Sequence, residues 1–259
     1  MSRFREYFPR AKTIIGMIHL PPLPGYSDSP GIEYAIRHAA GDLHALEAAG
    51  VDGALIENEY DRPHRVEAAP ETTAAMTRIT RAVVQESDAA RVGCEILLND
   101  PKASLAVARM SGASFIRTDY FVDRMTRPEY GEFHIDPEGL LGYRSSIGAD
   151  NVLILADIQV KYASMVEPRP LADSAKLARD MGADAVVVTG SKSGSAPTLK
   201  SLREAAQGIP VLIGSGLTAK NAKRLLQECD GAIVGTSLMK DRFIDPAAVA
   251  ELMSQVERD

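Results

Sequence analysis

The feature that most constrains the fold is a regular alternation between short apolar runs and longer amphipathic segments. The first run, residues 13–18, is mostly apolar and rich in isoleucine, which predicts a buried strand. Residues 32–49 follow with apolar side chains at spacings of three and four, which predicts a helix that ends at Gly50. Eight such units are predicted, with strands at 13–18, 52–56, 92–98, 114–117, 152–156, 185–188, 211–213 and 232–234, and helices at 32–49, 71–87, from Pro101 onward, 136–147, 171–181, 199–206, 218–227 and 245–256.

Eight consecutive strand and helix units favour an α/β fold, the closed (β/α)₈ or TIM barrel, over an open doubly wound sheet, which usually has five or six strands. Three short helix-to-strand joints, each built on a glycine at position 50, 112 or 182, support this choice. We interpret residues 1–259 as one barrel domain in which residues 1–11 are an N-terminal extension. The long segments 19–31, 57–70, 118–135 and 157–170 then fall on the carboxyl-terminal face of the barrel.

Charge and composition argue against several classes of function. The net charge is −6 and the basic residues are scattered, so no face for nucleic acid is expected. Cys94 and Cys229 lie far apart, which indicates neither a disulfide framework nor a zinc site. No apolar stretch reaches the roughly 18 residues of a membrane-spanning helix, and residues 1–10 lack the apolar core of a secretion signal. We therefore expect a cytoplasmic protein.

Glycine and hydroxyl residues follow the last two predicted strands. Glycine lets a ligand approach backbone N–H groups, hydroxyls add donors, and barrels of this kind often bind phosphate at these two loops. Each segment alone could be only a tight turn, but the pair predicts a phosphate-binding site. Its candidate residues are Gly214, Ser215, Gly216, Gly235, Thr236 and Ser237.

The end of the sixth predicted strand is a further candidate wall of that site. Thr189, Gly190 and Ser191 follow an apolar run there. The next segment, residues 192–195, contains two serines and a glycine and could close on a ligand. A simple solvated loop explains that segment equally well.

Polar side chains end most of the earlier strands, where a buried strand would otherwise finish in apolar or turn residues. Each has a purely structural interpretation, such as a loop cap, an ion pair or a hydrogen-bonded core histidine. Together on one rim, carboxyl groups beside Lys and Arg form an arrangement that shifts pKa values toward those used in proton transfer. The candidates are His19, Glu57, Asn58, Glu95, Asn99, Arg117, Asp119, Asp157 and Lys161.

Carboxylates on several strands also suggest a divalent metal, although their spacing specifies no site and no cofactor is implied by any motif. Hard oxygen ligands suit Mg²⁺ or Mn²⁺. The sequence has no Walker loop, no Gly-x-Gly-x-x-Gly after the first strand and no Ser-His-Asp order, so nicotinamide chemistry and acyl transfer have little support. The candidate metal ligands are Glu57, Asp61, Glu95, Asp119 and Asp157.

Several segments resemble motifs of the BtpA/SgcQ family. Residues 15–25, Ile-Gly-Met-Ile-His-Leu-Pro-Pro-Leu-Pro-Gly, are similar to its opening signature, and residues 57–63, Glu-Asn-Glu-Tyr-Asp-Arg-Pro, to its second motif. Tyr162 and His64 depart from the family pattern, which has a histidine and an aromatic residue at these places. Further similar segments are residues 98–100, 156–161 and 188–190 with Gly194 and Pro197, so the resemblance covers nearly the whole chain.

This resemblance implies a barrel like those that bind ribulose phosphate, in agreement with the loop chemistry. The family takes its name from a photosystem I biogenesis factor, while other members occur in what look like sugar or nucleoside catabolic settings. The Pro-rich segment 20–25 beside His19 suits the wall of a pocket better than an interface, because prolines fix the backbone before a ligand binds. That favours an enzyme.

The leading hypothesis is an enzyme of isomerase, epimerase or aldolase type that acts on a phosphorylated sugar or related phosphate ester by proton transfer next to a carbonyl. Glu57 and Asp157 are its candidate general acid and base, and Lys161 or Arg117 would stabilise the oxyanion. His19 would relay a proton. Lys161 could instead form a Schiff base. The candidate substrate-binding residues are Asn58, Asn99, Asp119, Thr189 and Gly190.

Two other functions remain open at this point. One is a docking scaffold that assists the biogenesis of a protein complex. The other is a metal-dependent phosphate-ester or nucleotide hydrolase. By analogy with other barrels, self-association into a homo-oligomer is also expected.

Overall fold

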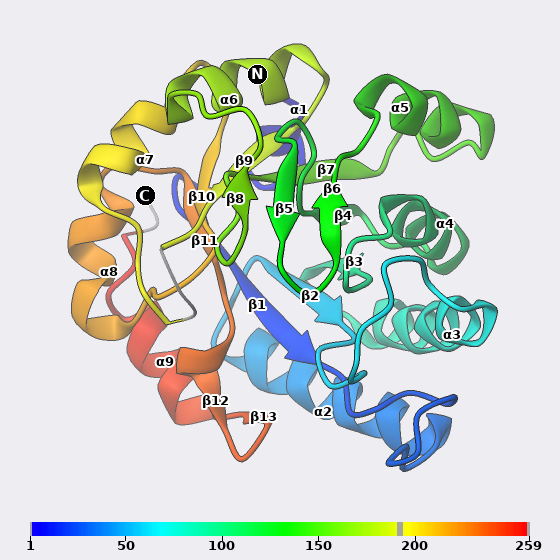
Figure 1. Ribbon diagram of the computed structural model, residues 1–259. Coiled ribbons are helices and arrows are strands. Elements are labelled where there is room, and N and C mark those ends of the chain that lie inside the picture. Colours follow the sequence, from blue (N-terminus) through cyan, green and yellow to red (C-terminus); the bar gives the residue numbers. More distant parts are fainter. Residues whose placement is uncertain (1, 191–193, 258–259) are drawn as a thin grey trace.

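The computed structural model describes residues 2–190 and 194–257. Its eight parallel strands close into a barrel in the order β1, β11, β10, β9, β7, β4, β3, β2 (Figure 1). The predicted barrel fold is therefore confirmed. The barrel strands are β1 (Thr13–His19), β2 (Gly53–Glu57), β3 (Arg91–Glu95), β4 (Phe115–Thr118), β7 (Leu153–Ile158), β9 (Ala185–Val188), β10 (Val211–Ile213) and β11 (Gly231–Val234).

A helix follows each barrel strand and covers the outside of the barrel (Figure 1). These helices bury apolar side chains at spacings of three and four, as the sequence pattern predicted. None of the described helices combines the length and apolar character needed to cross a membrane. The helices are α2 (Ile32–Ala48), α3 (Pro70–Glu86), α4 (Pro101–Ser111), α5 (Pro137–Ser146), α6 (Leu171–Asp180), α7 (Leu199–Ala205), α8 (Ala219–Leu226) and α9 (Pro246–Met253), with a short 3₁₀ helix η1 (Thr236–Leu238) after β11.

The N-terminal extension forms a helix that the sequence pattern did not predict, α1 (Arg3–Tyr7). Phe4 and Phe8 on this segment are fully buried. The Phe8 ring packs edge-on against Phe115 of β4, with 5.7 Å between ring centroids. These rings join an apolar cluster with inward-facing strand residues such as Ile15. One end of the barrel interior is thus filled by hydrocarbon.

Short strands also form inside the segments that were predicted as long loops. β5 (Met125–Arg127), β6 (Gly131–Phe133) and β8 (Ser164–Met165) make a small antiparallel sheet from the segments that follow β4 and β7. A second hairpin, β12 (Met239–Lys240) with β13 (Phe243–Ile244), follows η1. Each of these short strands lies between a barrel strand and the next helix.

Most predicted element boundaries differ from the structure by one or two residues, but the third strand was predicted too long. It was placed at residues 92–98, whereas β3 ends at Glu95. The Leu97 N–H donates to Asn58 Oδ1 at 2.7 Å and the Leu97 carbonyl accepts from Asn58 Nδ2 at 3.4 Å. Because a side chain from the neighbouring loop takes these backbone groups, the strand cannot continue, and Glu95 becomes its last residue.

The glycine joints between helices and strands are as predicted. Gly50, Gly112 and Gly182 have φ angles of 76°, 85° and 84°. This is the left-handed region, in which a side chain with a Cβ is strained. Each glycine lets a helix end and return to the next strand within a few residues.

Candidate active site at the carboxyl ends of the strands

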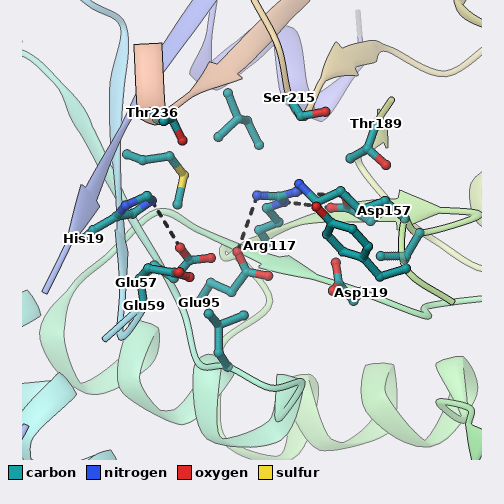
Figure 2. A pocket seen from close by; sticks show the side chains of 18 of the residues that line it. His19, Glu57, Glu59, Glu95, Arg117, Asp119, Asp157, Thr189, Ser215 and Thr236 are labelled. Atoms are coloured by element: carbon teal, nitrogen blue, oxygen red, sulfur yellow. Dashed lines mark hydrogen bonds and ion pairs between the residues drawn. The ribbon is translucent and has the colours of Figure 1, made fainter. Parts of the chain in front are cut away.

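A cavity of about 440 Å³ opens at the carboxyl ends of the barrel strands. Its size is within the range of small-molecule sites. Most of the residues singled out in the sequence line it, and Figure 2 shows ten cavity residues with labels. The lining includes His19, Glu57, Glu95, Arg117, Asp119, Asp157, Lys161, Thr189, Gly214, Ser215, Gly216, Gly235, Thr236 and Ser237.

The glycine-containing segments after β10 and β11 lie beside each other, because these two strands are neighbours in the barrel. Gly216 has a φ of 72°, and a Cβ there would lie 2.2 Å from the backbone nitrogen of Ala196. The Ser215 hydroxyl donates to the Ser195 carbonyl at 2.9 Å and accepts from the Gly190 N–H at 3.1 Å. The turn after β10 is thus fixed tightly to the segment after β9.

These two segments present donors that the protein leaves unused. Within the described part of the chain, no hydrogen bond uses the N–H of Gly216, Gly235 or Thr236. The Thr189 hydroxyl is buried and also has no hydrogen-bond partner among the described residues. Unpaired donors in a cavity wall are groups that an anionic ligand can satisfy.

Two buried carboxyl groups, Glu57 and Glu95, stand next to each other across from these donors (Figure 2). They end the neighbouring strands β2 and β3 and are 7% and 4% exposed. Burial, with a smaller effect of the Glu59 charge, raises the pKa of Glu57 to about 7. Burial also raises the pKa of Glu95 well above its ordinary value, and a hydrogen bond with Glu57 adds to this rise. Both carboxyl groups therefore keep their protons to a higher pH than exposed carboxyl groups do.

A charged pair, Arg117 and Asp157, occupies the centre of the cavity floor. Arg117 Nε lies 2.7 Å from Asp157 Oδ2 and Nη2 lies 2.9 Å from Oδ1, while Nη1 is 3.7 Å from Glu95. Burial lowers the pKa of Arg117, but Asp157 and Glu95 raise it overall, so the guanidinium stays charged. Because both Asp157 oxygens accept hydrogen bonds from Arg117, this carboxylate is engaged as a partner of the guanidinium.

His19 lies on the other side of the carboxyl pair. Its Nε2 is 3.3 Å from Glu57 Oε2. Burial lowers the pKa of His19, although the charges of Glu59 and Asp42 oppose the shift. A neutral imidazole beside a carboxyl group can exchange a proton with it. A Cβ on Gly235 would lie 3.1 Å from Met17 Cγ and 3.3 Å from the same Nε2, so a side chain there would crowd both residues.

Asp119 and Lys161 complete the ionisable groups of the cavity floor. Burial, followed by the charges of Asp157 and Glu95, raises the pKa of Asp119 well above its ordinary value. The positive charges of Arg117 and Lys161 oppose this shift. Lys161 forms no ion pair within 4.0 Å with any described carboxylate. Its charge remains available to a ligand.

Two amide residues predicted to bind substrate instead hold the loops together. Asn58 bonds to the backbone of Leu97 and is not among the cavity residues. Asn99 Oδ1 accepts from the Thr118 hydroxyl at 3.0 Å and from the Asp119 N–H at 3.1 Å. These bonds use both polar groups of Asn58 and the carbonyl oxygen of Asn99, so both side chains position the strand ends, and neither residue is among those that line the cavity.

Asp61 and Gly190 also face away from the cavity. The Asp61 carboxylate is fully buried and accepts from the Leu23 N–H at 2.8 Å and from Asn58 Nδ2 at 3.0 Å. At Gly190, a Cβ would lie 2.1 Å from the Ser195 carbonyl oxygen, so the next segment packs directly on its backbone. Neither residue is among those that line the cavity.

The predicted metal ligands do not converge in the described residues. Among them, no group of three or more His, Cys, Asp or Glu side chains is placed to hold a metal ion. Asp61 is occupied by the Leu23 N–H, and Asp157 by Arg117. The described residues therefore offer no set of three such ligands for the Mg²⁺ or Mn²⁺ ion that the carboxylates suggested. Residues 191–193, which include the predicted wall residue Ser191 and the first half of the closing segment 192–195, lie outside the described residues.

The sequence reasoning missed several cavity residues that come from the loops. They lie in the segments after β2, β3, β4 and β7, which have no repeating pattern that would predict their direction. Three of those segments were recognised as long and placed on the carboxyl-terminal face, which is the signal that was available. The missed cavity residues include Glu59, Arg62, His64, Leu97, Leu98, Arg127, Tyr130 and Val160.

Comparison with known sequences places the chain in a family. The model of the BtpA family matches residues 10–258. The chain belongs to the BtpA family. A photosystem I biogenesis protein, BtpA of Synechocystis, is 35% identical over 257 residues, which covers 95% of this chain and 88% of that protein. The putative sgc region protein SgcQ of Escherichia coli is 30% identical and covers 99% of this chain and 98% of its own length.

Solved structures share the barrel at low sequence identity. The tryptophan synthase α subunit of Legionella pneumophila superposes with a TM-score of 0.64 at 15% identity, covering 98% of both chains. Thiamine phosphate pyrophosphorylase of Pyrococcus furiosus superposes with a TM-score of 0.59 at 17% identity, covering 95% of both. At such identity these likenesses establish the fold of this BtpA-family member and nothing about its substrate.

Proposed function

We propose that this BtpA-family protein is an enzyme that binds a phosphorylated small molecule and transfers a proton next to its carbonyl group, as isomerases, epimerases and aldolases do. One observation carries the proposal: Glu57, a buried carboxyl group with a pKa of about 7, shares a cavity with the unpaired N–H groups of Gly216 and Thr236. A general base works best when its pKa lies near the working pH. An anchored phosphate would hold the reacting carbon against that base.

The phosphate belongs, in this proposal, on the turns after β10 and β11. Its oxygens accept hydrogen bonds from the N–H groups of Gly216, Gly235 and Thr236 and from the Thr189 hydroxyl. Figure 2 shows Thr236 and Thr189 along one side of the cavity, and Glu57 along the other. Thiamine phosphate pyrophosphorylase, which has the same fold, is named for a phosphorylated molecule, and this agrees with the assignment.

Proton transfer follows from the groups on the opposite side. The Glu57 carboxylate takes a proton from the carbon next to the carbonyl, the C–H electron pair forms a carbon–carbon double bond, and the carbonyl electrons move onto oxygen. Lys161, which has no close carboxylate partner, stabilises that oxyanion together with the charge of Arg117. Protonated Asp119 or Glu57 returns a proton to the neighbouring position. His19, 3.3 Å from Glu57, exchanges the proton with the solvent side.

Asp157 has a different place in this mechanism from the one expected from sequence. Both of its oxygens are bound to Arg117, so Glu57 is the better base. Asp157 holds the guanidinium in the cavity floor. This assignment makes Glu57 the residue whose replacement tests the proposal.

Hydrogen exchange with solvent tests the reaction without knowledge of the product. The protein is incubated with a panel of aldose and ketose phosphates in D₂O, and proton NMR follows the C–H signal next to the carbonyl. At least one compound should exchange, and Glu57→Gln should slow that exchange by about a hundredfold or more. Glu86→Gln, a change at an exposed carboxyl group on α3, is the matched control and should exchange like the wild type.

Binding of inorganic phosphate separates the two halves of the proposal. A rise of the unfolding temperature with phosphate should occur in the wild type and in Glu57→Gln, because the anion contacts are backbone groups. Phosphate binding without exchange of any panel member would reject the proton transfer. Absence of phosphate binding would reject the site itself.

The aldolase branch predicts a covalent intermediate. If Lys161 attacks the carbonyl to form a Schiff base, borohydride added with the reactive substrate should give a stable adduct, detected by mass spectrometry. Lys161→Met should abolish the adduct. If hydrogen exchange occurs without any adduct, the result favours direct proton transfer through an enediolate over a Schiff base on Lys161.

A second function, assistance in assembling a protein complex, is favoured by the name of one relative, the photosystem I biogenesis protein. That function predicts tolerance of change inside the cavity. Rescue of a deletion strain by the Glu57→Gln protein, as complete as rescue by the wild type, would support the assembly role over the enzyme.

A further inference from the structure

A second cation in the cavity wall lacks a close counter-ion. Arg127 ends β5, lines the cavity and has a side chain that is 20% exposed. The carboxylate nearest to it among the described residues is Glu129, at the long distance of 4.0 Å, and Glu129 is itself 65% exposed. Arg127 Nε is buried and has no hydrogen-bond partner among the same residues. A buried donor without an acceptor is unfavourable, and an anion beside it would satisfy it.

The other arginines that line the cavity are already paired. Arg117 donates two hydrogen bonds to Asp157. Arg62 forms an ion pair with Glu59. Arg127 is therefore the lining arginine in the described part of the chain whose charge is left for a ligand.

Arg127 lies across the barrel opening from the proposed phosphate site. It belongs to the segment after β4, and β4 is four strands from β11 in both directions, through β10, β9 and β7 or through β1, β2 and β3. In Figure 1, β5 and the β12 strand that follows β11 lie on different sides of the opening. A ligand anchored at Gly235 and Thr236 would thus direct its far end toward Arg127.

We propose that Arg127 and Tyr130 form a second anion subsite, so that the substrate is a phosphorylated carbonyl compound with a second anionic group at its other end. This inference rests on the proposed function and adds the class of substrate. The planar guanidinium group of arginine can donate two parallel hydrogen bonds to the oxygens of a carboxylate or a phosphate. The guanidinium carbon lies 5.4 Å from the centre of the Tyr130 ring, which restricts its orientation. Leu98 and Val160 line the same cavity and belong to the apolar cluster against which Tyr130 packs.

Binding affinities of three six-carbon probes test the subsite. Fructose 6-phosphate has one anionic group, fructose 1,6-bisphosphate has a second phosphate, and 6-phosphogluconate has a carboxylate instead. In the wild type, at least one of the two doubly anionic probes should bind about tenfold or more tightly than fructose 6-phosphate, measured by calorimetry. Which of the two is preferred identifies the second group.

Substitution of Arg127 then tests whether this residue causes the preference for a doubly anionic probe. Arg127→Gln should remove it while the dissociation constant of fructose 6-phosphate changes by no more than about twofold. Arg124→Gln is the matched control, because Arg124 lies in the same segment, pairs with Glu132 and Glu167, and does not line the cavity. It should keep the preference. If Arg127→Gln does not fold, Arg127→Lys, which keeps the charge but loses the fork, should reduce the preference.

The outcomes separate this inference from the proposed function. If fructose 6-phosphate binds and neither doubly anionic probe binds more tightly, the second subsite is rejected and the phosphate site stands. If Arg127→Gln weakens all three probes equally, the residue acts on the fold and not on a second anion, which also rejects the subsite. If neither inorganic phosphate nor any probe binds, the proposed function fails and this inference with it.

Discussion

Replacing Glu57 by glutamine should stabilise the protein at alkaline pH. The Glu57 side chain is 7% exposed, and burial with the Glu59 charge raises its pKa from 4.5 to about 7. Because the folded state binds this proton more tightly than the unfolded state, the favourable contribution is complete below pH 4.5 and is lost as pH rises through 7. Glutamine has nearly the same shape and no such loss.

The magnitude follows from the size of the shift. A rise from 4.5 to about 7 corresponds, at 1.36 kcal/mol per unit, to about 3 kcal/mol. Between pH 5 and pH 8 the wild type should lose about 2 to 3 kcal/mol of unfolding free energy through this group. The advantage of Glu57→Gln over the wild type should therefore grow by that amount over the same interval.

Urea unfolding of both proteins at pH 5, 6, 7 and 8 measures this difference. Glu47→Gln is a control of opposite sign. Burial raises the pKa of Glu47, but hydrogen bonds from the N–H groups of Ala90 and Ala89 outweigh this and lower it, so its carboxylate stabilises the fold above pH 4.5. Because this contribution changes only below about pH 4.5, Glu47→Gln should lose nearly the same stability at all four pH values. If the difference in unfolding free energy between Glu57→Gln and the wild type is the same at pH 5 and pH 8, the Glu57 carboxyl group does not have a pKa near 7 in the folded protein.

Three further substitutions probe other parts of the account. Gly235→Ala places a methyl group 3.3 Å from His19 Nε2, and it should destabilise the protein by about 1 to 2 kcal/mol. It should also weaken phosphate binding, measured by calorimetry, by about tenfold. Unchanged phosphate binding would show that this turn is not part of the site. Asp157→Asn deprives the buried Arg117 of its counter-ion and should cost about 3 to 5 kcal/mol in urea unfolding, whereas a cost under about 1 kcal/mol would contradict a buried ion pair. Phe8→Ala removes a fully buried ring and should cost about 3 to 5 kcal/mol in thermal unfolding, and a neutral result would show that α1 is dispensable.

The barrel could be predicted from the sequence because its elements repeat a simple physical pattern. Buried strands such as β9 are continuous apolar runs, and the glycines at 50, 112 and 182 mark the returns from helix to strand. Polar residues at strand ends, among them Glu57 and Arg117, could also be placed on one rim, since parallel strands in a barrel end on the same face. These predictions depend only on local pattern and on closure of the barrel.

The direction of individual side chains could not be predicted in the same way. Asn58 and Asn99 follow strand ends just as Glu57 does, yet their amides bind the backbone of neighbouring loops. Arg127 lies in a segment that the sequence marks only as long, and it reaches the cavity because β5 pairs with β6 and β8. Such pairings join segments far apart in the chain, and no periodicity reports them. The burial that raises the pKa of Glu57 is likewise a property of the assembled barrel.

A crystal structure of the protein with a sugar phosphate that exchanges its proton in D₂O tests the central claim most directly. The account predicts the phosphate between the turns after β10 and β11, with oxygens bound to the N–H groups of Gly216 and Thr236, and the carbon next to the carbonyl beside Glu57. A phosphate bound elsewhere, or a carbonyl group directed away from Glu57, would contradict it.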